Sequence, residues 1–216
     1  MDTITIVKLF FVFLIGGAFG SFLNVCIYRI PLGRSIVRPP SACPSCGHKL
    51  LWWENIPLIS FLLLKGRCRV CTTGISIQYP IVELLGGIIV AINYWRWDGI
   101  TPQMILFSIL GFILIVVAFI DFRYFLINNA VILTGTIIGI GGIFFLPDFP
   151  WKAALFGAII GGGSLYLARL LGFVLFHKES LGWGDIKLEG MLGIYLGWQK
   201  TLLSVGLGFF LPYCLE

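Results

Sequence analysis

The sequence predicts an all-α integral membrane protein, a polytopic helix bundle with a cytoplasmic four-cysteine zinc-knuckle loop between its first two spans. Of its 216 residues, 58% are hydrophobic and 12% are charged, and the mean hydropathy is +0.98. A soluble domain is about 45–50% apolar and about 25% charged, so this chain would expose too much apolar surface in water. The apolar runs lack the period-2 alternation of a membrane β-barrel, which leaves helices as the spanning elements.

Several apolar runs reach or approach the length of about 20 residues that a helix needs to cross a bilayer. The clear runs are residues 9–28, 100–120, 124–147 and 153–176. A further run, residues 80–97, is weaker at its ends because of Glu83 and Arg96. Residues 191–199 and 201–215 are short for full spans. The sequence therefore predicts a multi-pass protein whose number of spans near the C-terminus stays open.

The first run raises the question of a cleaved signal peptide, because Lys8 precedes it. It is about as long as a bilayer is thick, and no small-residue cleavage site follows before Tyr28. We therefore expect a retained transmembrane helix.

Positive charge is concentrated in the segment between the first two runs. Beside a single acidic residue, Glu54, this segment holds the following basic residues: Arg29, Arg34, Arg38, Lys49, Lys65, Arg67 and Arg69. Cytoplasmic loops carry the excess of Lys and Arg in membrane proteins, so we expect this segment in the cytoplasm and the N-terminus outside. The net charge of +5 then reflects membrane topology, and we expect membrane lipid and no nucleic acid as a partner.

One long polar segment between apolar sequences suggests that the chain has three domains. Residues 1–29 form the first transmembrane helix. Residues 30–78, the only long polar segment, form a cytoplasmic zinc-binding loop domain. Residues 79–216 form a polytopic membrane core, in which the abundant glycines, 27 in the whole chain, would allow helices to approach closely.

The zinc prediction rests on two C-x-x-C pairs in the polar segment, Cys43/Cys46 and Cys68/Cys71. Each pair presents two thiolates from one turn, and four thiolates complete a tetrahedral zinc shell. Two redox pairs or disulfides are the alternatives, although a cytoplasmic location disfavours stable disulfides. A closed four-sulfur shell leaves no open position, so the metal would be structural. We expect His48 to be a loop histidine without a metal role.

Two carboxylates at the borders of apolar runs are the candidate catalytic residues. Asp121 ends one run, and Asp185 lies in the sequence Gly182-Trp183-Gly184-Asp185, on the same side by the orientation argument. Two close carboxylates cannot readily both ionise, so one would hold a proton while the other activates water. The glycines would let a substrate backbone approach Asp185. Alternatively, each Asp is a solvated helix cap or a partner for Arg123 or Lys187.

These residues resemble those of the type IV prepilin peptidases, bifunctional leader peptidase/N-methyltransferases of bacteria. The similarity runs from about residue 16 to residue 200, with the following matching stretches: GSFLNVCIYRIP (20–31), CPSCGHKLLWWENIPLISFLLLKGRCRVC (43–71), ISIQYPIVE (75–83), Ile120-Asp121 and GWGDIKLEGMLGIYLGWQ (182–199).

The resemblance implies an aspartic endopeptidase of the G-x-G-D class in the bacterial inner membrane, with Asp121 and Asp185 as its catalytic dyad. Gly182, Gly184 and Lys187 are the remaining motif residues where substrate would approach. Its substrates would be prepilins or pseudopilins, cut after a glycine that follows a basic cytoplasmic leader. The new N-terminus would then be methylated with S-adenosylmethionine, and the active site would face the cytoplasm.

The chain departs from the family pattern at two places. The family usually shows Pro-Asp after Leu126-Ile127, whereas this chain has Asn128-Asn129. The chain also ends inside an apolar run, whereas the family continues with a further helix, so we expect a naturally short or truncated core. The alternative to the peptidase is therefore a non-catalytic or truncated membrane scaffold that binds partners through its zinc loop.

Overall fold

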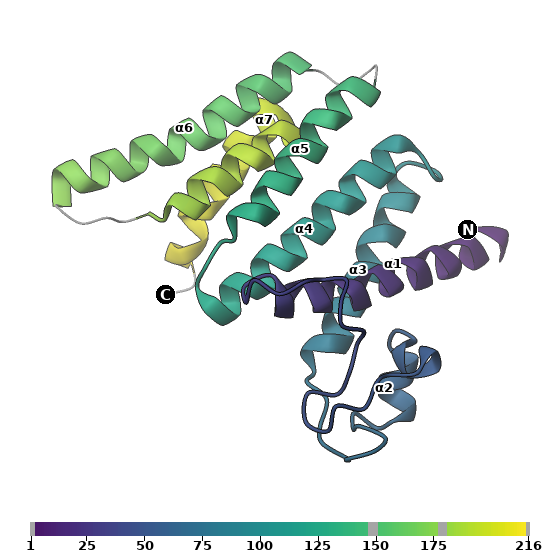
Figure 1. Ribbon diagram of the computed structural model, residues 1–216. Coiled ribbons are helices and arrows are strands. Elements are labelled where there is room, and N and C mark those ends of the chain that lie inside the picture. The colour runs from purple at the N-terminus through teal and green to yellow at the C-terminus, as the bar shows by residue number, and fades with distance from the viewer. Residues whose placement is uncertain (1–2, 147–150, 177–180, 215–216) are drawn as a thin grey trace. The chain divides into compact units, whose positions relative to one another are not determined.

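The computed structural model describes residues 3–146, 151–176 and 181–214 and divides the chain into two compact units, Met1–Phe125 and Leu126–Glu216 (Figure 1). The regular elements of the described residues are helices, with no β-strand beyond two isolated bridges, which confirms the all-α fold class. The division into units does not coincide with the expected domain boundaries, which stay a prediction.

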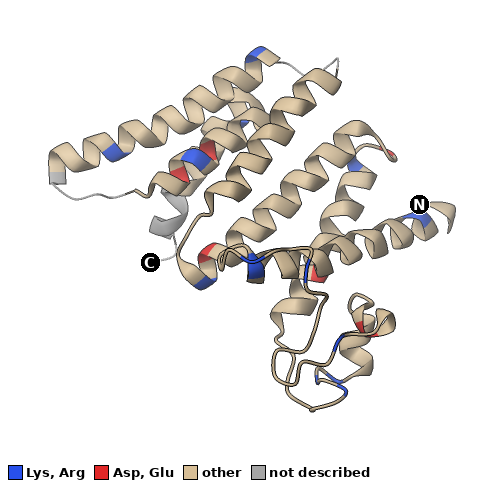
Figure 2. Ribbon diagram, in the orientation of Figure 1, with Lys and Arg blue, Asp and Glu red and all other residues tan. Residues whose placement is uncertain are grey.

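Three of the described helices are long and apolar enough to cross a membrane: Thr3–Arg29, Pro102–Tyr124 and Trp151–Leu175. Figure 2 shows that most charged residues lie near helix ends or in the polar loop, with long uncharged stretches between them. The run expected at 124–147 is a shorter apolar helix, Asn129–Phe145. Pro147 and Leu215, the last residues of the expected runs 124–147 and 201–215, lie outside the described residues.

The first unit contains, in chain order, α1 (Thr3–Arg29), the short 3-10 helix η1 (Trp52–Asn55), α2 (Ile59–Leu63), α3 (Gln78–Arg96) and α4 (Pro102–Tyr124). Helix α3 packs against α1, and α4 packs against both of them. The polar loop lies between α1 and α3 in sequence and contains η1 and α2.

Glycines allow α1 and α3 to cross in backbone contact. A Cβ atom added to Gly16 would lie 2.5 Å from the carbonyl oxygen of Gly86, and one added to Gly20 would lie 2.6 Å from the Cα of Glu83. Just beyond this crossing, the buried Asn24 donates from Nδ2 to the carbonyl oxygen of Tyr79 at 3.1 Å. Small residues with one polar contact are the usual means of joining helices in a membrane, as the sequence suggested for its glycines.

Helix α4 has defined ends, which matter because it carries Asp121. It begins with Pro102 in its first turn, after Thr101, whose hydroxyl accepts a hydrogen bond from the Met104 amide at 3.1 Å. It ends at Tyr124, and the next residue, Phe125, has a left-handed conformation (φ 51°) that lets its amide donate to the Asp121 carbonyl oxygen at 2.7 Å. Such a left-handed residue stops a helix and satisfies one of its last carbonyls.

The second unit contains α5 (Asn129–Phe145), α6 (Trp151–Phe176) and α7 (Trp183–Cys214), and α7 packs against both of the others. The hydroxyl of Tyr195 on α7 donates to the Gly135 carbonyl oxygen on α5 at 2.6 Å. Gly157 on α6 and Gly193 on α7 touch through their backbones, since a Cβ on either would lie 2.2 Å from the other's carbonyl oxygen.

Helix α7 turns back on itself at Gly197, which has non-helical angles (φ 72°, ψ 164°). Gly161 on α6 lies against both Glu189 and Thr201. In a straight helix these two residues would be about 18 Å apart at about 1.5 Å per residue. The reversal lies three residues before Lys200, the charged residue that separates the two short apolar runs in the sequence.

Candidate functional site

Asp121 lies in the last turn of α4, in the first unit, and is exposed. The Phe125 amide caps this end of the helix by donating to the main-chain carbonyl oxygen of Asp121. The carboxylate of Asp121 takes no part in that cap. The expected position at the end of an apolar span is therefore observed, and a role for the side chain in catalysis stays a prediction.

Asp185 lies in the first turn of α7, in the second unit, and is partly exposed. Its Oδ2 accepts a hydrogen bond of 3.2 Å from the amide of Gly182. An acidic side chain in the first turn that accepts from the residue before the helix is one half of a capping box. Asp185 Oδ2 therefore caps the start of α7, which is one of the alternatives that the sequence left open. This hydrogen bond orients the carboxylate.

The two glycines before Asp185 have close neighbours. A Cβ on Gly182 would lie 2.9 Å from Asp185 Oδ2, and one on Gly184 would lie 2.7 Å from the Cβ of Ile127. Gly184 therefore has a packing reason to be glycine, beside the substrate approach that the sequence suggested. The first reason is observed, and the second stays a prediction.

Lys187 lies two residues beyond Asp185, and its Nζ donates to Asn129 Oδ1 at 2.9 Å. The neighbouring Asn128 caps α5, because its Oδ1 accepts from the Ala130 amide at 2.9 Å. The Asn128-Asn129 pair, which departs from the family pattern, thus begins α5 and attaches that helix to α7. Both asparagines have structural contacts in this chain.

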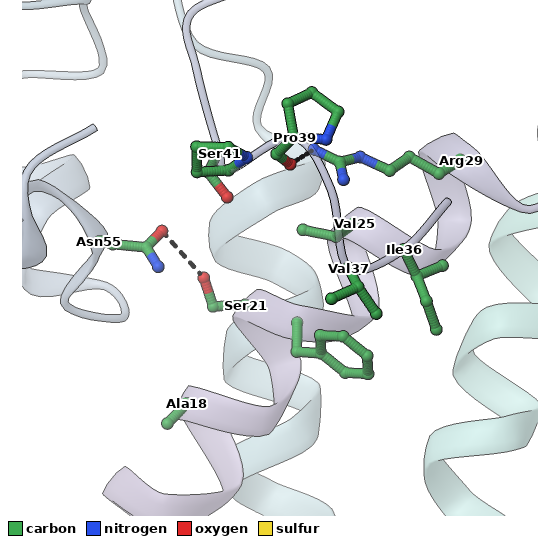
Figure 3. A pocket seen from close by; sticks show the side chains of 11 residues that line it. Ala18, Ser21, Val25, Arg29, Ile36, Val37, Pro39, Ser41 and Asn55 are labelled. Carbon is green, nitrogen blue, oxygen red and sulfur yellow. Dashed lines mark hydrogen bonds between the residues drawn. The ribbon is translucent and has the colours of Figure 1, made fainter. Parts of the chain in front are cut away.

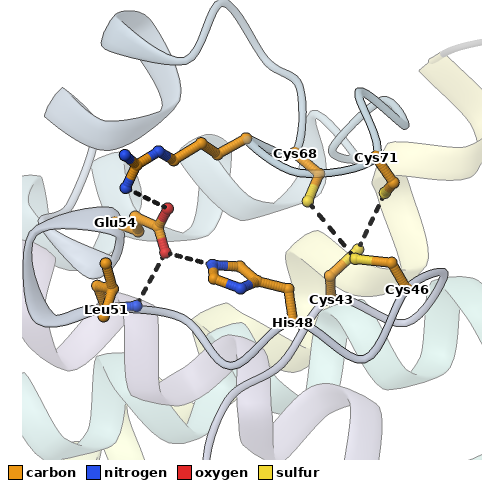
Figure 4. A network of polar contacts seen from close by, with 8 residues as sticks. Cys43, Cys46, His48, Leu51, Glu54, Cys68 and Cys71 are labelled. Atoms are coloured by element: carbon orange, nitrogen blue, oxygen red, sulfur yellow. Dashed lines mark hydrogen bonds and ion pairs between the residues drawn. The ribbon is translucent and has the colours of Figure 1, made fainter.

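The four loop cysteines come together as the knuckle spacing predicts. Their sulfur atoms all lie within 4.8 Å of one another, with 3.7 Å between Cys43 and Cys71 and 4.0 Å between Cys46 and Cys68 (Figure 4). A tetrahedron with zinc–sulfur bonds of about 2.3 Å has edges of about 3.8 Å, whereas a disulfide needs about 2.05 Å. The four thiols therefore fit a metal such as zinc, and all four are free of disulfides.

The two knuckles share one backbone design. The Cys43 amide donates to the His48 carbonyl and the Cys68 amide to the Thr73 carbonyl, and each turn is closed by an isolated bridge. The fourth residue after the first cysteine is left-handed in both, Gly47 at φ 72° and Thr72 at φ 56°. The amides of Cys46 and Ser45 lower the pKa of Cys43, which favours the thiolate that binds metal.

The same effect is present in the second knuckle. The hydroxyl of Thr73 lies 3.3 Å from Cys71 Sγ. The hydroxyl and the backbone amide of Thr73 lower the pKa of Cys71 to about 6. Hydrogen bonds to the charged form of a thiol favour that form. Each knuckle therefore holds one cysteine whose pKa is lowered.

Glu54 is a buried loop residue whose contacts the sequence interpretation missed. It is 5% exposed, and its Oε2 accepts from the Leu51 amide at 2.9 Å and lies 3.0 Å from His48 Nε2 (Figure 4). Arg69 Nη1 lies 4.0 Å from its Oε1, and the guanidinium lies over the Trp53 ring. The Leu51 amide, His48 and Arg69 lower the pKa of Glu54, against the effect of burial. A single acidic residue among many basic ones was the signal available in the sequence.

His48 pairs with Glu54, as described above, and is not one of the four clustered metal-ligand candidates among the described residues. That His48 has no metal role stays a prediction. Because His48 lies two residues after Cys46 and Arg69 directly after Cys68, the Glu54 carboxylate links the two knuckles from outside the sulfur cluster.

The loop attaches to the helices through a strained turn. Leu58 has φ 61° and ψ −43°, and the Ile59 amide donates to the Pro57 carbonyl at 2.6 Å, which forms a γ-turn. The Leu58 amide donates to the buried Glu83 Oε2 of α3 at 2.8 Å. Strained backbone persists where surrounding contacts hold it, and here Glu83 supplies that contact.

A cavity of about 260 Å³ lies between α1 and residues 36–41 of the loop (Figure 3). Ser21, Ser41 and Asn55 contribute polar groups, and the Arg29 guanidinium donates to the carbonyls of Ser35 and Pro39 at 3.0 and 2.8 Å. None of the lining residues is acidic. The cavity therefore lacks the carboxylate pair that hydrolysis by an aspartic dyad needs.

Comparisons with known proteins agree with the resemblance seen in the sequence. The model of the bacterial peptidase A24 N-terminal domain matches residues 14–97, and that of the type IV leader peptidase family matches residues 107–215. No solved structure matches the chain significantly.

Curated relatives carry the name prepilin leader peptidase/N-methyltransferase. The protein from Klebsiella pneumoniae is 40% identical over 207 residues, which cover 89% of this chain and 88% of the relative. The protein from Pseudomonas aeruginosa is 35% identical over 215 residues, with 89% and 74% coverage. The protein from Myxococcus xanthus is 42% identical over 195 residues, which cover 89% of this chain but 57% of the relative.

The two family models follow one another along the chain, and relatives with the same name match most of it. Helices that suit a bilayer, together with the clustered cysteines, agree with that assignment. The predicted resemblance is confirmed, and the chain belongs to the type IV leader peptidase family of membrane enzymes.

Proposed function

We propose that the chain is an aspartic endopeptidase that removes the leader from type IV prepilins or pseudopilins at the cytoplasmic face of the bacterial inner membrane. Asp121 and Asp185 form its catalytic dyad in this proposal. The names of the relatives support the substrate class and the peptidase activity.

One observation carries the assignment of the two residues. Asp121 lies at the C-terminal end of α4 and Asp185 in the first turn of α7, with the apolar helices α5 and α6 between them in the chain. If α5 and α6 each cross the bilayer, the chain crosses twice between the two carboxylates. Both carboxylates then lie at the same membrane surface.

The chemistry follows from two carboxyl groups that share one proton. The ionised group takes a proton from water as the water oxygen attacks the scissile carbonyl carbon, and the protonated group donates to the carbonyl oxygen. The carbon–nitrogen bond then breaks, and the amine nitrogen leaves with a proton from the dyad. In this scheme the Gly182 amide holds Asp185 Oδ2 in a fixed direction.

The basic loop supports the proposed orientation. Its excess of Lys and Arg between α1 and α3 is typical of a cytoplasmic segment. The prepilin leader is basic and stays in the cytoplasm, as the family resemblance implies. The four cysteines would hold a structural zinc ion that shapes this loop without taking part in hydrolysis.

Methylation of the new N-terminus is the second proposed activity, favoured by the N-methyltransferase name of the relatives. S-adenosylmethionine would supply the methyl group. Its sulfonium and amino groups are cationic, and the cavity beside α1 offers them no acidic residue. The lining residues therefore do not fit the donor, and we assign no methyl-transfer step to that cavity.

The function is tested with the purified full chain in lipid and a prepilin-like substrate that has a basic leader, a glycine and a hydrophobic helix. We expect intact-mass spectrometry to show cleavage after that glycine. With labelled S-adenosylmethionine present, we expect a labelled methyl group on the mature product. A matched substrate with the glycine replaced by a bulky residue should stay uncut.

The outcomes separate the alternatives. An uncut substrate with folded, zinc-loaded protein would contradict the peptidase and favour the membrane scaffold that binds partners through its loop. Cleavage without any methyl label would retain the peptidase and remove the methyltransferase.

A further inference from the structure

Arg169 interrupts the apolar sequence of α6, about two turns before the helix ends at Phe176. Its guanidinium lies 4.8 Å from the centre of the Trp183 ring, and its Nη1 donates a hydrogen bond to the Leu181 carbonyl oxygen. A charged residue inside an apolar helix is costly in a membrane and calls for a specific role. Here both contacts reach the segment that leads into α7.

These contacts lie on either side of Gly182, whose amide holds the Asp185 carboxylate. The Trp183 ring also lies 6.1 Å from the Tyr166 ring, which is one turn before Arg169 on the same helix. Two α6 side chains thus hold the first residue of α7. The direction of the Asp185 carboxylate depends on this short segment, because the Gly182 amide donates a hydrogen bond to Asp185 Oδ2.

The chemistry of arginine suits this position. Its planar guanidinium can stack on an aromatic ring while its edge donates to a carbonyl oxygen. Lysine, with a compact ammonium group, would keep the charge but could not reproduce the stacked plane and the edge donor together. A glutamine would keep a donor and lose the charge.

We propose that Arg169 is a positioning residue for Asp185, holding Leu181 and Trp183 so that the first turn of α7 presents the carboxylate in its working direction. The proposal rests on the proposed function of Asp185. Arg169 itself touches no reacting atom in this account and acts through the segment before Asp185.

The test compares Arg169→Lys, Arg169→Gln and Trp183→Phe with a matched control, Lys152→Gln. Lys152 lies on the first turn of the same helix with its Nζ 5.6 Å from the centre of the Trp151 ring, so the control removes a similar cation–aromatic contact far along α6. Cleavage is measured as separate kcat and KM values in lipid. Amide hydrogen exchange over residues 181–188 is measured on the same proteins.

We expect Arg169→Gln to lower kcat about 10- to 100-fold with little change in KM, because misplacement of a catalytic group by about 1 Å costs about that much. Arg169→Lys should lower kcat less than Arg169→Gln does, and Trp183→Phe, which keeps an aromatic ring, should lower it least. Exchange over residues 181–188 should rise in Arg169→Gln and stay unchanged in Lys152→Gln.

Wild-type kcat in Arg169→Gln, or unchanged exchange over residues 181–188, would overturn the proposal. So would an equal loss in Lys152→Gln. If Arg169→Gln does not fold, Arg169→Lys decides by the same two measurements. An inactive wild type would instead contradict the proposed function, and the exchange measurement, which needs no activity, would still decide whether Arg169 holds the segment.

Discussion

Lys187 Nζ lies 2.9 Å from Asn129 Oδ1, so the start of α7 is attached to the start of α5 by one side-chain hydrogen bond. The bond lies at the same end of the unit as Asp185, two residues before Lys187 in the chain. Since the carbonyl oxygen of an amide is a weaker acceptor for an ammonium group than a carboxylate, this contact can be strengthened by one substitution.

Asn129→Asp should stabilise the protein by about 0.5–1 kcal/mol, because a hydrogen bond from the ammonium group to a neutral amide oxygen becomes an exposed ion pair. Lys187→Ala should lower stability by a similar amount and remove the benefit of Asn129→Asp in a double-mutant cycle. Unfolding in lipid–detergent mixtures measures both. Lys200→Ala, an exposed cation on the same helix, is the control, and an equal effect of Asn129→Asp with and without Lys187 would contradict the pairing.

The cysteine cluster predicts one zinc ion per chain, bound by the loop. Cys68→Ser should weaken zinc binding by more than about a hundredfold, because a thiolate ligand is lost from a closed shell. Chelation should make residues 42–74 sensitive to protease while the helices stay intact. Cys26→Ala, a buried cysteine of α1 outside the cluster, should keep its metal, and loss of zinc in this control alone would contradict the assignment.

The left-handed residues of the two knuckles predict opposite effects of two substitutions. Thr72→Gly should tighten zinc binding by about 0.5–1 kcal/mol, because a β-branched residue is strained at φ 56°. The loss of the Thr72 hydroxyl bond to the Cys71 carbonyl offsets part of this gain. Gly47→Ala should weaken binding by a similar amount.

The control for this pair is Gly74→Ala. A Cβ on Gly74 or on Gly47 would meet nothing within 4 Å, but only Gly47 has a positive φ. Competition with a chromophoric chelator measures all three affinities. Equal effects of Gly47→Ala and Gly74→Ala would show that the backbone conformation is not the cause.

The crossing of α1 and α3 predicts that Gly20→Ala destabilises the first unit by about 1–3 kcal/mol. The added methyl group would lie 2.6 Å from the Glu83 Cα, and a backbone cannot move aside as a side chain can. Gly141→Ala on α5 is the control, because its added methyl would meet nothing within 4 Å and alanine is a better helix former. Detergent unfolding followed by circular dichroism should separate them, and equal stability of the two variants would contradict a tight crossing.

Much of the fold could be predicted from the sequence because helix length and apolar character are local properties. The C-x-x-C spacing predicted the cysteine cluster because each knuckle is a short turn. Lys200 also divides the apolar sequence after Asp185 into two short runs, but only the backbone angles show that the helix is interrupted at Gly197.

Contacts between distant residues could not be predicted in this way. Arg169 could be recognised as a charge in an apolar run, but its partner Leu181 depends on how α6 and α7 pack. Glu54 was visible as the one acidic residue of a basic loop, yet its burial depends on the pairing of the two knuckles. Gly184 suggested access for substrate, whereas its contact with Ile127 required the arrangement of α5 and α7.

Asp121 and Asp185 are proposed to act together in peptide-bond cleavage. The most direct test is the cleavage rate of wild type, Asp121→Asn, Asp185→Asn, the double variant and Asp98→Asn on one prepilin-like substrate in lipid. Asp98 lies in the turn between α3 and α4 at φ 50°, a conformation that asparagine tolerates well, so this control keeps the fold and removes a carboxylate elsewhere. We expect each of the first two variants to lose about a thousandfold or more of the rate, the double variant to lose no more than either one, and Asp98→Asn to match wild type. Near-normal cleavage by Asp121→Asn or by Asp185→Asn in folded, zinc-loaded protein would contradict the dyad.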